Sequence, residues 1–354
     1  MSAVLATSVL CFAFFFLLTL PLAPACRELI YKTDGEPLKV IQQHAGDVRF
    51  FADGFRHYLK AIQADLDQCA QAGTDTSIVM PDGMTCLVLA RLDGQHDFGI
   101  DAKSTCSRVI ASVGVLTLPH STTFEKDIYA RQTLRGGNGD EYRAILGEHE
   151  IHLGEASTVN RWVHGVGEVS CERDCRLHGR ISSESTIRLH AGCRFTRLNA
   201  PRIEIGAAKV NESPVEDAFS KHSSVLTERL LHDGDLSIAP GEVMDRHLVV
   251  RGELRIGEGA HLLGNVKAQK DVFLSTGVRA YGSMISGATL RIGAECQVRG
   301  PLIAERMIAV GQGARMGTLD APTTVSAPHI EIAEGARVFG TLWAREQGQV
   351  VRPA

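Results

Sequence analysis

The amino-acid sequence predicts an all-β fold: a single-stranded, three-sided β-helix (β-solenoid) with about 18 residues per coil. One observation is a repeat of apolar pairs at i and i+2, the spacing of side chains on one face of a strand. A second is composition. Aromatic residues make up only 6% of the chain and glycines number 35, which suits short strands joined by tight turns. The clearest pairs, at steps of 18, 18, 18 and 22 residues, are Leu254/Ile256, Val272/Leu274, Leu290/Ile292, Ile308/Val310 and Ile330/Ile332.

A second apolar pair follows 11 or 12 residues after the first in each coil. Because one coil cannot bury its own inner face, stacked neighbours must bury it together. The same form recurs earlier in the chain, so we expect a first part of the β-helix at 78–206 and a second part at 234–345. The second pairs are Val266/Ala268, Met284/Ser286, Leu302/Ala304, Leu319/Ala321 and Leu342/Ala344. The earlier first pairs are Ile78/Met80, Phe98/Ile100, Leu116/Leu118, Ile151/Leu153, Val169/Cys171 and Ile187/Leu189.

The N-terminal segment is strongly apolar. Residues 1–25 carry no charged side chain, and about 20 apolar residues can span a bilayer as a helix, so we expect a transmembrane anchor at 4–23. A cleaved signal peptide is the alternative. Ala23-Pro24-Ala25 resembles a cleavage site, but the positive n-region is absent.

Orientation in a membrane follows from the lysines and arginines that flank a span. Here they occur only after it, at Arg27, Lys32 and Lys39. The positive-inside rule therefore predicts a single-pass protein with a short N-terminal tail outside and most of the chain in the cytoplasm.

Residues 36–72 are expected to form a helical, membrane-proximal segment, because apolar residues recur there at steps of three and four. Gly46 and Gly54 weaken its middle, so two shorter helices are an alternative. Gly73 is placed to end the helix. We expect the apolar stripe to pack on the first coils; a dimerising or partner-binding helix is the other interpretation.

Residues 207–233 interrupt the repeat and are expected to be a helical insertion. Ser213 and Glu216 form a capping box around Pro214, which predicts a helix at about 214–231 that Gly234 ends. A helix that braces the solenoid flank is expected, with a partner site as the alternative.

The coil form resembles the bactofilin family of polymer-forming bacterial cytoskeletal proteins. The segment that carries the resemblance best is Leu254-Arg-Ile-Gly-Glu-Gly-Ala-His-Leu-Leu-Gly-Asn-Val-Lys-Ala268. The resemblance covers 230–345 well and 145–206 more loosely. It implies a right-handed β-helix that assembles end to end without nucleotide, often at a membrane, and positions envelope proteins. The chain departs from the family in its longer array, its insertion and its ordered residues 26–145.

The end coils are candidate sites of self-association, because an uncapped coil exposes unpaired strand edges. Only ten residues follow Ala344, too few for a capping helix, whereas residues 36–72 can cover the other end. We expect contacts between copies of the chain through Ile330, Ile332, Val338 and Leu342, and one covered end favours a dimer over a filament.

No set of convergent catalytic groups emerges from the sequence, so no catalytic, cofactor-binding or metal-binding residue is assigned. The histidines are scattered through turns, and Glu150 and Glu168 share a column but are expected on a solvated face. The net charge of −4 gives no basic face for nucleic acid. Cys171, Cys175 and Cys193 cluster without a Cys-x-x-Cys pair, so buried free thiols are preferred to zinc. The histidines considered are His149, His152, His178, His190, His247 and His261.

The function expected from the sequence is that of a non-enzymatic, membrane-anchored, self-associating scaffold of bactofilin type. Together with the expected anchor, the resemblance implies a single-pass protein of the bacterial inner membrane. Its partners would be other copies of the chain, the membrane through 4–23, and envelope proteins. One alternative is a left-handed β-helix acyltransferase, which consecutive hexapeptide repeats would support. The other is an exported carbohydrate-acting β-helix, which aromatic residues gathered on one face would support.

Overall fold

The computed structural model describes residues 3–23, 27, 48–91, 102–206 and 228–351. The chain divides into two compact units, Met1–Val40 and Ile41–Ala354. The first unit contains helix α1 (Ala3–Thr19) followed by the 3-10 turn η1 (Leu20–Leu22).

The expected transmembrane anchor at 4–23 is wrong. No helix within the described ranges is long and apolar enough to cross a membrane. Helix α1 has 17 residues, or roughly 26 Å at 1.5 Å per residue, against a hydrocarbon core of about 30 Å. It stops where Pro21 enters the 3-10 turn, because proline lacks the N–H that would continue the helix. The predicted single-pass location in the bacterial inner membrane falls with the anchor.

The described part of the second unit starts with two helices joined by a 3-10 turn: α3 (Phe50–Leu59), η2 (Lys60–Ile62) and α4 (Gln63–Ala72). The break lies at η2 rather than at Gly54, and Gly46 lies outside the described residues. Gly73 ends α4 as predicted, with a φ of 63° and its N–H bonded to the carbonyl of Cys69. The part of the expected helical segment at 36–47 lies outside the described residues.

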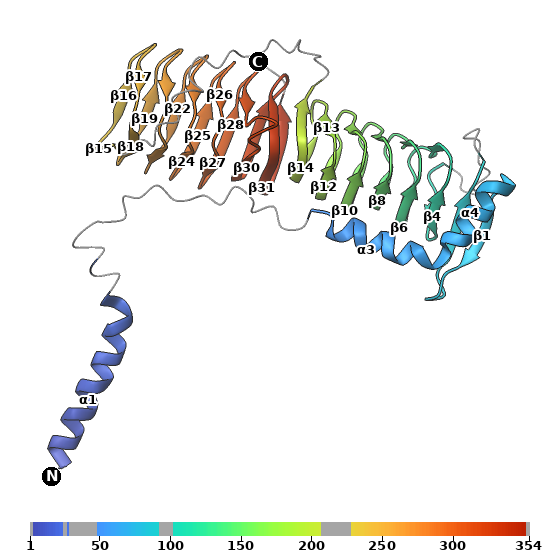
Figure 1. Ribbon diagram of the computed structural model, residues 1–354, viewed down its shortest axis with the longest axis horizontal. Coiled ribbons are helices and arrows are strands. Elements are labelled where there is room, and N and C mark those ends of the chain that lie inside the picture. Colours follow the sequence, from blue (N-terminus) through green and yellow to red (C-terminus); the bar gives the residue numbers. More distant parts are fainter. Residues whose placement is uncertain (1–2, 24–26, 28–47, 92–101, 207–227, 352–354) are drawn as a thin grey trace. The chain divides into compact units, whose positions relative to one another are not determined.

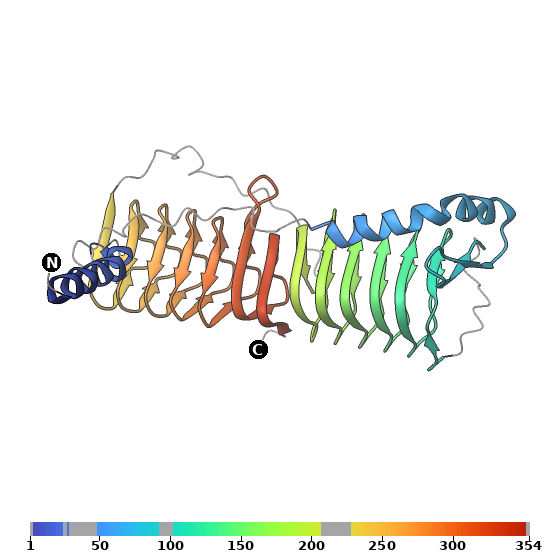
Figure 2. The same cartoon turned by 90° about the horizontal axis from the view of Figure 1, so that it is seen from below.

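The apolar stripe of these helices packs on the solenoid, as the sequence predicts. Phe55, Leu59 and Leu66 share a cluster of buried residues with outward-facing apolar residues of the first coils, such as Val88 and Leu146. Figure 2 shows α3 running along the flank of those coils.

The rest of the unit is a β-solenoid of about 13 coils at a spacing of about 18 residues. Three parallel ladders of strands form its three sides. In the second array the first ladder runs through Leu254, Val272, Leu290 and Ile308, with paired residues 18 apart. The second ladder runs through the strand at Val266 and the third through the strand at His261. The inward side chains of all three ladders form one continuous core.

The strands form two arrays along the chain. Those of the first are β1 (Thr76–Val79), β2 (Thr85–Leu89), β3 (Thr105–Cys106), β4 (Val109–Ser112), β5 (Leu116–Thr117), β6 (Thr123–Ala130), β7 (Leu134–Arg135), β8 (Glu141–Gly147), β9 (Ile151–Leu153), β10 (Thr158–Gly165), β11 (Val169–Cys171), β12 (Arg176–Ser183), β13 (Thr186–Leu189) and β14 (Arg194–Ile205). Those of the second are β15 (Arg229–His232), β16 (Leu236–Ile238), β17 (Val243–Met244), β18 (His247–Val250), β19 (Leu254–Ile256), β20 (His261–Leu262), β21 (Val266–Ala268), β22 (Val272–Leu274), β23 (Arg279–Ala280), β24 (Met284–Ser286), β25 (Thr289–Ile292), β26 (Gln297–Val298), β27 (Leu302–Ala304), β28 (Met307–Val310), β29 (Arg315–Met316), β30 (Thr323–Ala333) and β31 (Arg337–Val351).

The structure differs from the predicted repeat at three places. Ile78 lies in β1, which pairs antiparallel with β2 as a hairpin rather than forming a coil. Leu319 is exposed in a turn that a hydrogen bond from Thr318 to Ala321 closes, so Val325 takes its place opposite Leu302. The array also continues past Ala344, because β31 extends to Val351. The predicted pair Phe98/Ile100 lies outside the described residues.

Most of the predicted insertion at 207–233 also lies outside the described residues, which resume at 228. Its final part does not continue the expected helix, since 229–232 is strand β15. Strand β15 pairs with β18 in the second ladder, so the second array begins before residue 234.

The two arrays meet through their last coils. Strand β14 ends the first array and β31 ends the second, and the two pair antiparallel. Figure 1 shows β14 beside β31, with β15 at the opposite end of the second array. The two arrays therefore present three kinds of end coil: the joined pair, the hairpin end at β1, and the end at β15.

Candidate functional site

The four residues predicted to mediate self-association lie in the joined coils. Val338 pairs with Ile203 and Leu342 with Leu198, both across β14–β31. Ile330 and Ile332 lie one strand earlier on β30, opposite β31. All four side chains are at most 1% exposed. Self-association through them stays a prediction, but the edge of their coil is already paired within the chain.

The junction between β14 and β31 is closed by side chains as well as by backbone pairing. The Nδ2 of Asn199 donates to the Oγ1 of Thr341 at 2.7 Å. The guanidinium of Arg197 lies 5.0 Å from the ring centroid of Trp343, within cation–π range. Gly348 has no Cβ, and one placed there would meet the ring of Phe195 at 2.2 Å. The junction is thus fitted on both sides, and among the described residues β14 and β31 pair along the edges of both end coils.

The pairing at the junction follows a two-fold pattern. Leu198 and Leu342 both belong to second ladders, so the second ladder of one array pairs with the second ladder of the other. Ile203 belongs to a first ladder whereas its partner Val338 belongs to a third ladder. Two coils of this chain can therefore stack face to face when one is rotated by half a turn about an axis through the second side.

The end coil formed by β15, β16 and β17 is open by comparison. Each of these strands pairs on one side only, with β18, β19 and β20 respectively, as far as the described residues go. Its inward side chains Leu230, Leu236 and Met244 are only partly buried, whereas the residues paired with them in the next coil are at most 1% exposed. Leu231 and Val243 are each 49% exposed. We call residues 229–246 the open end coil.

The opposite end, at β1, is covered. The β1–β2 hairpin reverses the chain and stops the parallel ladder there. Met80 and Cys86 are at most 2% exposed, and the fully buried Leu66 of α4 packs in the same cluster. Strands β3 and β5 pair on one side only among the described residues, but their inward Cys106 and Leu116 are at most 2% exposed, unlike the inward residues of the open end coil.

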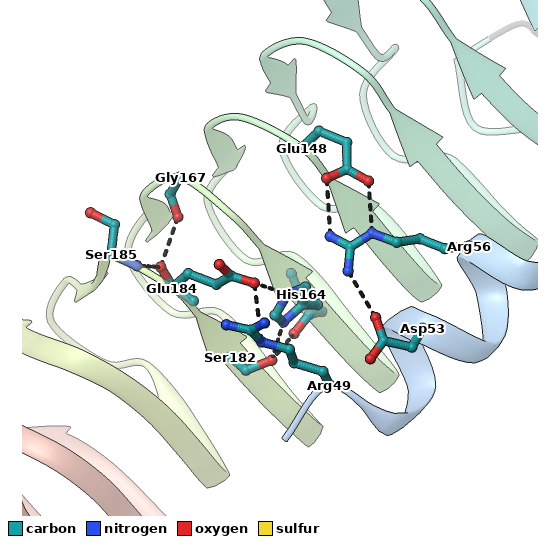
Figure 3. A network of polar contacts seen from close by, with 11 residues as sticks. Arg49, Asp53, Arg56, Glu148, His164, Gly167, Ser182, Glu184 and Ser185 are labelled. Carbon is teal, nitrogen blue, oxygen red and sulfur yellow. Dashed lines mark hydrogen bonds and ion pairs between the residues drawn. The ribbon is translucent and has the colours of Figure 1, made fainter. Parts of the chain in front are cut away.

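Helix α3 is held on the first array by ion pairs with two of its coils (Figure 3). Arg56 makes a bidentate contact with Glu148, at 2.9 and 3.0 Å, and a third contact with Asp53 at 3.1 Å. Arg49 pairs with Glu184 at 3.2 Å, two coils further along. The spacing fits, because seven helical residues rise about 10.5 Å and two coils about 9.6 Å. The helix and the array thus share a register along the stacking direction.

We call the ion pairs of Arg49 and Arg56 with the first array the α3 clamp. A buried histidine lies beside this clamp. His164 is 2% exposed; its Nδ1 lies 2.9 Å from the Oγ of Ser182 and its Nε2 lies 3.5 Å from a carboxylate oxygen of Glu184 (Figure 3). Burial lowers the pKa of His164, and the charges of Arg56 and Arg49 lower it further, while Glu184 opposes them. The neutral imidazole is therefore the form that this site favours near neutral pH.

The histidines considered from the sequence do not converge. His152 contacts Ser170 at 2.6 Å and Glu150 at 3.4 Å, and His247 accepts a hydrogen bond from the backbone of Asn265. Glu168 pairs with Arg188 at 2.6 Å. The contacts of His152 with Ser170, of His247 with Asn265 and of Glu168 with Arg188 join neighbouring coils, whereas Glu150 and His152 belong to the same coil.

The three clustered cysteines lie in the core as free thiols. Cys171, Cys175 and Cys193 are all fully buried, and burial raises the pKa of the Cys171 thiol. Across the described segments, no group of three or more His, Cys, Asp or Glu is placed to hold a metal ion.

Comparisons with protein-family models, with curated proteins and with solved structures found no significant match to this chain. The site assignment therefore depends on the geometry above. The sequence repeat points to end coils as candidate sites, but neither the junction nor the openness of residues 229–246 follows from it.

Proposed function

We propose that this chain is a non-enzymatic structural scaffold that associates with a second copy of itself through the open end coil. The observation that carries the proposal is the incomplete burial of Leu230, Leu236 and Met244, beside strands that pair on one side only. An unpaired strand edge over an exposed apolar core favours the addition of another coil. The bactofilin resemblance of 230–345 supports the same class of function.

The junction between the arrays suggests how two copies meet. There, second ladders face each other and first ladders face third ladders. If two open end coils stack in the same way, one rotated by half a turn about an axis through its second side, β15 pairs with β15 of the other copy. Strand β16 then pairs with β17 of the other copy. The inward residues of both coils would then be covered, as they are at β14–β31. Because the β1 end is closed, this contact gives a dimer rather than a filament.

The test is sedimentation velocity of the full chain over a concentration series. Wild-type protein is expected to sediment as a dimer at high concentration. The pair Leu236→Lys and Met244→Lys, which places charges at the coil edge, should weaken the dimer at least tenfold. Leu319→Lys, in an exposed turn, is the matched control and should leave it unchanged.

Two results would contradict the proposal. One is a wild-type chain that stays monomeric at every concentration. The other is a dimer that survives both lysine substitutions, as expected if copies associate through the exposed phenylalanines of α1 instead.

A further inference from the structure

A groove of about 320 Å³ lies between helix α3 and the flank of the first array. Its apolar wall consists of aromatic rings. Phe51 and Phe55 of α3 lie against Trp162 of β10, with ring centroids 6.4 and 6.0 Å from that of the indole. The volume lies within the range of small-molecule sites, about 300–1,000 Å³, which are typically apolar with a few convergent polar groups.

The polar side of the groove is mostly cationic. Lys126, Arg143 and Arg161 line it, and Asp127 is the one carboxylate among its lining residues. Arg143 contacts Asp127 at 2.6 Å, so one cation is neutralised. Lys126 and Arg161 are left to give the groove an excess of positive charge.

The walls are fixed before any ligand arrives. The ion pairs of Arg49 and Arg56 hold α3 against the coils from which Trp162 projects. Phe55 and Trp162 are only 7% and 6% exposed. A pre-formed wall lowers the entropic cost of binding, because these rings lose little freedom when a ligand packs on them.

We propose that this groove binds a small planar aromatic anion, a ring system that carries a carboxylate, sulfonate or phosphate. The ring would pack on Phe51 and Trp162, and the anionic group would lie toward Lys126 and Arg161. Neutral aromatic molecules lack the second contact, and inorganic anions lack the first. This inference is independent of the proposed self-association, since the groove lies in the first array.

Gly54 offers a way to close the groove without damaging the fold. It lies on α3, lines the groove, and a Cβ built there meets no atom within 4 Å. Gly54→Leu should therefore fill the groove from the helix side. Gly54→Ala is the matched control, because a single methyl group leaves most of the volume open.

The probe is 8-anilinonaphthalene-1-sulfonate, titrated into the full chain and followed by energy transfer from Trp162. The chain has two tryptophans, so the experiment uses a Trp343→Phe background. We expect saturable binding that Gly54→Leu weakens at least tenfold and Gly54→Ala changes less than threefold. Circular dichroism of each variant checks that the fold is intact.

Charge is tested separately. The pair Lys126→Glu and Arg161→Glu should weaken binding of the sulfonate at least tenfold, whereas Lys267→Glu and Lys270→Glu, both exposed on the second array, should not. N-phenyl-1-naphthylamine, which has the same rings without the sulfonate, should bind at least tenfold more weakly to wild type. The proposal is overturned if Gly54→Leu or the groove charge reversal leaves the affinity unchanged, or if the neutral probe binds equally well.

Discussion

The two ends of the second array are built from the same repeat but are covered differently. At β31 the inward residues Val338 and Leu342 are fully buried, because β14 pairs with the strand edge above them. At β15 the corresponding residues are partly exposed, and only the next coil pairs with them among the residues described. The repeat itself thus does not determine whether an end coil is covered. What makes an end closed or open is the segment that stacks on it.

The contrast also shows what closure requires. The junction adds specific fitting to strand pairing, with Gly348 leaving space for Phe195 and Asn199 bonded to Thr341. The open end coil offers the exposed side chains of Leu231 and Val243 and the partly buried Met244 instead. Such a surface suits a reversible contact between copies, whereas the junction is part of a single continuous core.

The largest effect should come from charges placed inside the closed junction. Val338→Asp with Leu342→Asp buries two carboxylates that have no partner, and we expect the free energy of unfolding to fall by at least about 4 kcal/mol. Leu236→Asp with Met244→Asp is the matched pair at the open end coil, where the carboxylates can reach water, and it should cost less than about 2 kcal/mol. Chemical denaturation followed by tryptophan fluorescence measures both.

Equal losses from the two aspartate pairs would break the comparison, because they would show that the end at β15 is covered in solution. In that case, measuring the free energy of unfolding at several protein concentrations shows what covers the end. Coverage by a second copy makes the stability of the wild-type chain concentration-dependent, whereas coverage within the chain does not.

A smaller effect is expected from adding one methyl group to the junction. In Gly348→Ala the new Cβ would lie 2.2 Å from the Phe195 ring, so the ring must move, at a cost of roughly 1–3 kcal/mol. Gly54→Ala is the contrasting change, because its Cβ meets nothing and alanine favours the helix by about 0.5–1 kcal/mol. The two midpoints of thermal unfolding should therefore move in opposite directions. If Gly348→Ala leaves the midpoint unchanged, the Phe195 ring is not held tightly against residue 348, which contradicts a closely fitted junction.

The coils were predictable because most of them repeat the same inward positions at a step of 18 residues. Leu254, Val272 and Leu290 lie 18 residues apart in the sequence, and they pair in the register that this spacing predicts. Leu319 fitted the pattern equally well but lies in a turn, since local hydrogen bonds and not apolar spacing decide which residues of a longer coil loop out. The pattern therefore gives the ladder but not its irregularities.

The sites were not predictable in the same way. Asn199 and Thr341 are 142 residues apart, and Arg56 and Glu148 are 92 apart, so neither contact leaves a periodic signal. Strand β14 pairs antiparallel with β31, whereas the strands of each ladder pair parallel, so the repeat gives no sign of this contact. The anchor failed for a different reason: the apolar composition was real, but the proline after Leu20 cuts the helix short.

The smallest expected effect is a loss of stability at low pH in the first array and not in the second. The pKa of His164 is lowered in the folded chain by burial and by Arg56 and Arg49, so below its ordinary value of about 6.5 the unfolded chain binds more protons at this residue. Its contribution to stability is therefore fully present above pH 6.5 and is lost as the pH falls toward the folded pKa. His164, Ser182 and Glu184 all lie in the first array, next to helix α3. Acidification from pH 7.5 to 5 should therefore lower the stability of that array specifically.

Hydrogen exchange measured at both pH values gives the array-by-array readout. Protection of α3 and of β10–β12 should fall at pH 5 relative to the second array, after correction for intrinsic exchange rates. His164→Gln, which keeps a polar contact for Ser182 but cannot be protonated, should remove the difference. The exposed His178→Gln is the matched control and should retain it, as it lies on the same array outside the clamp. Equal acid sensitivity of both arrays, or no change in His164→Gln, would show that the buried imidazole does not distinguish them.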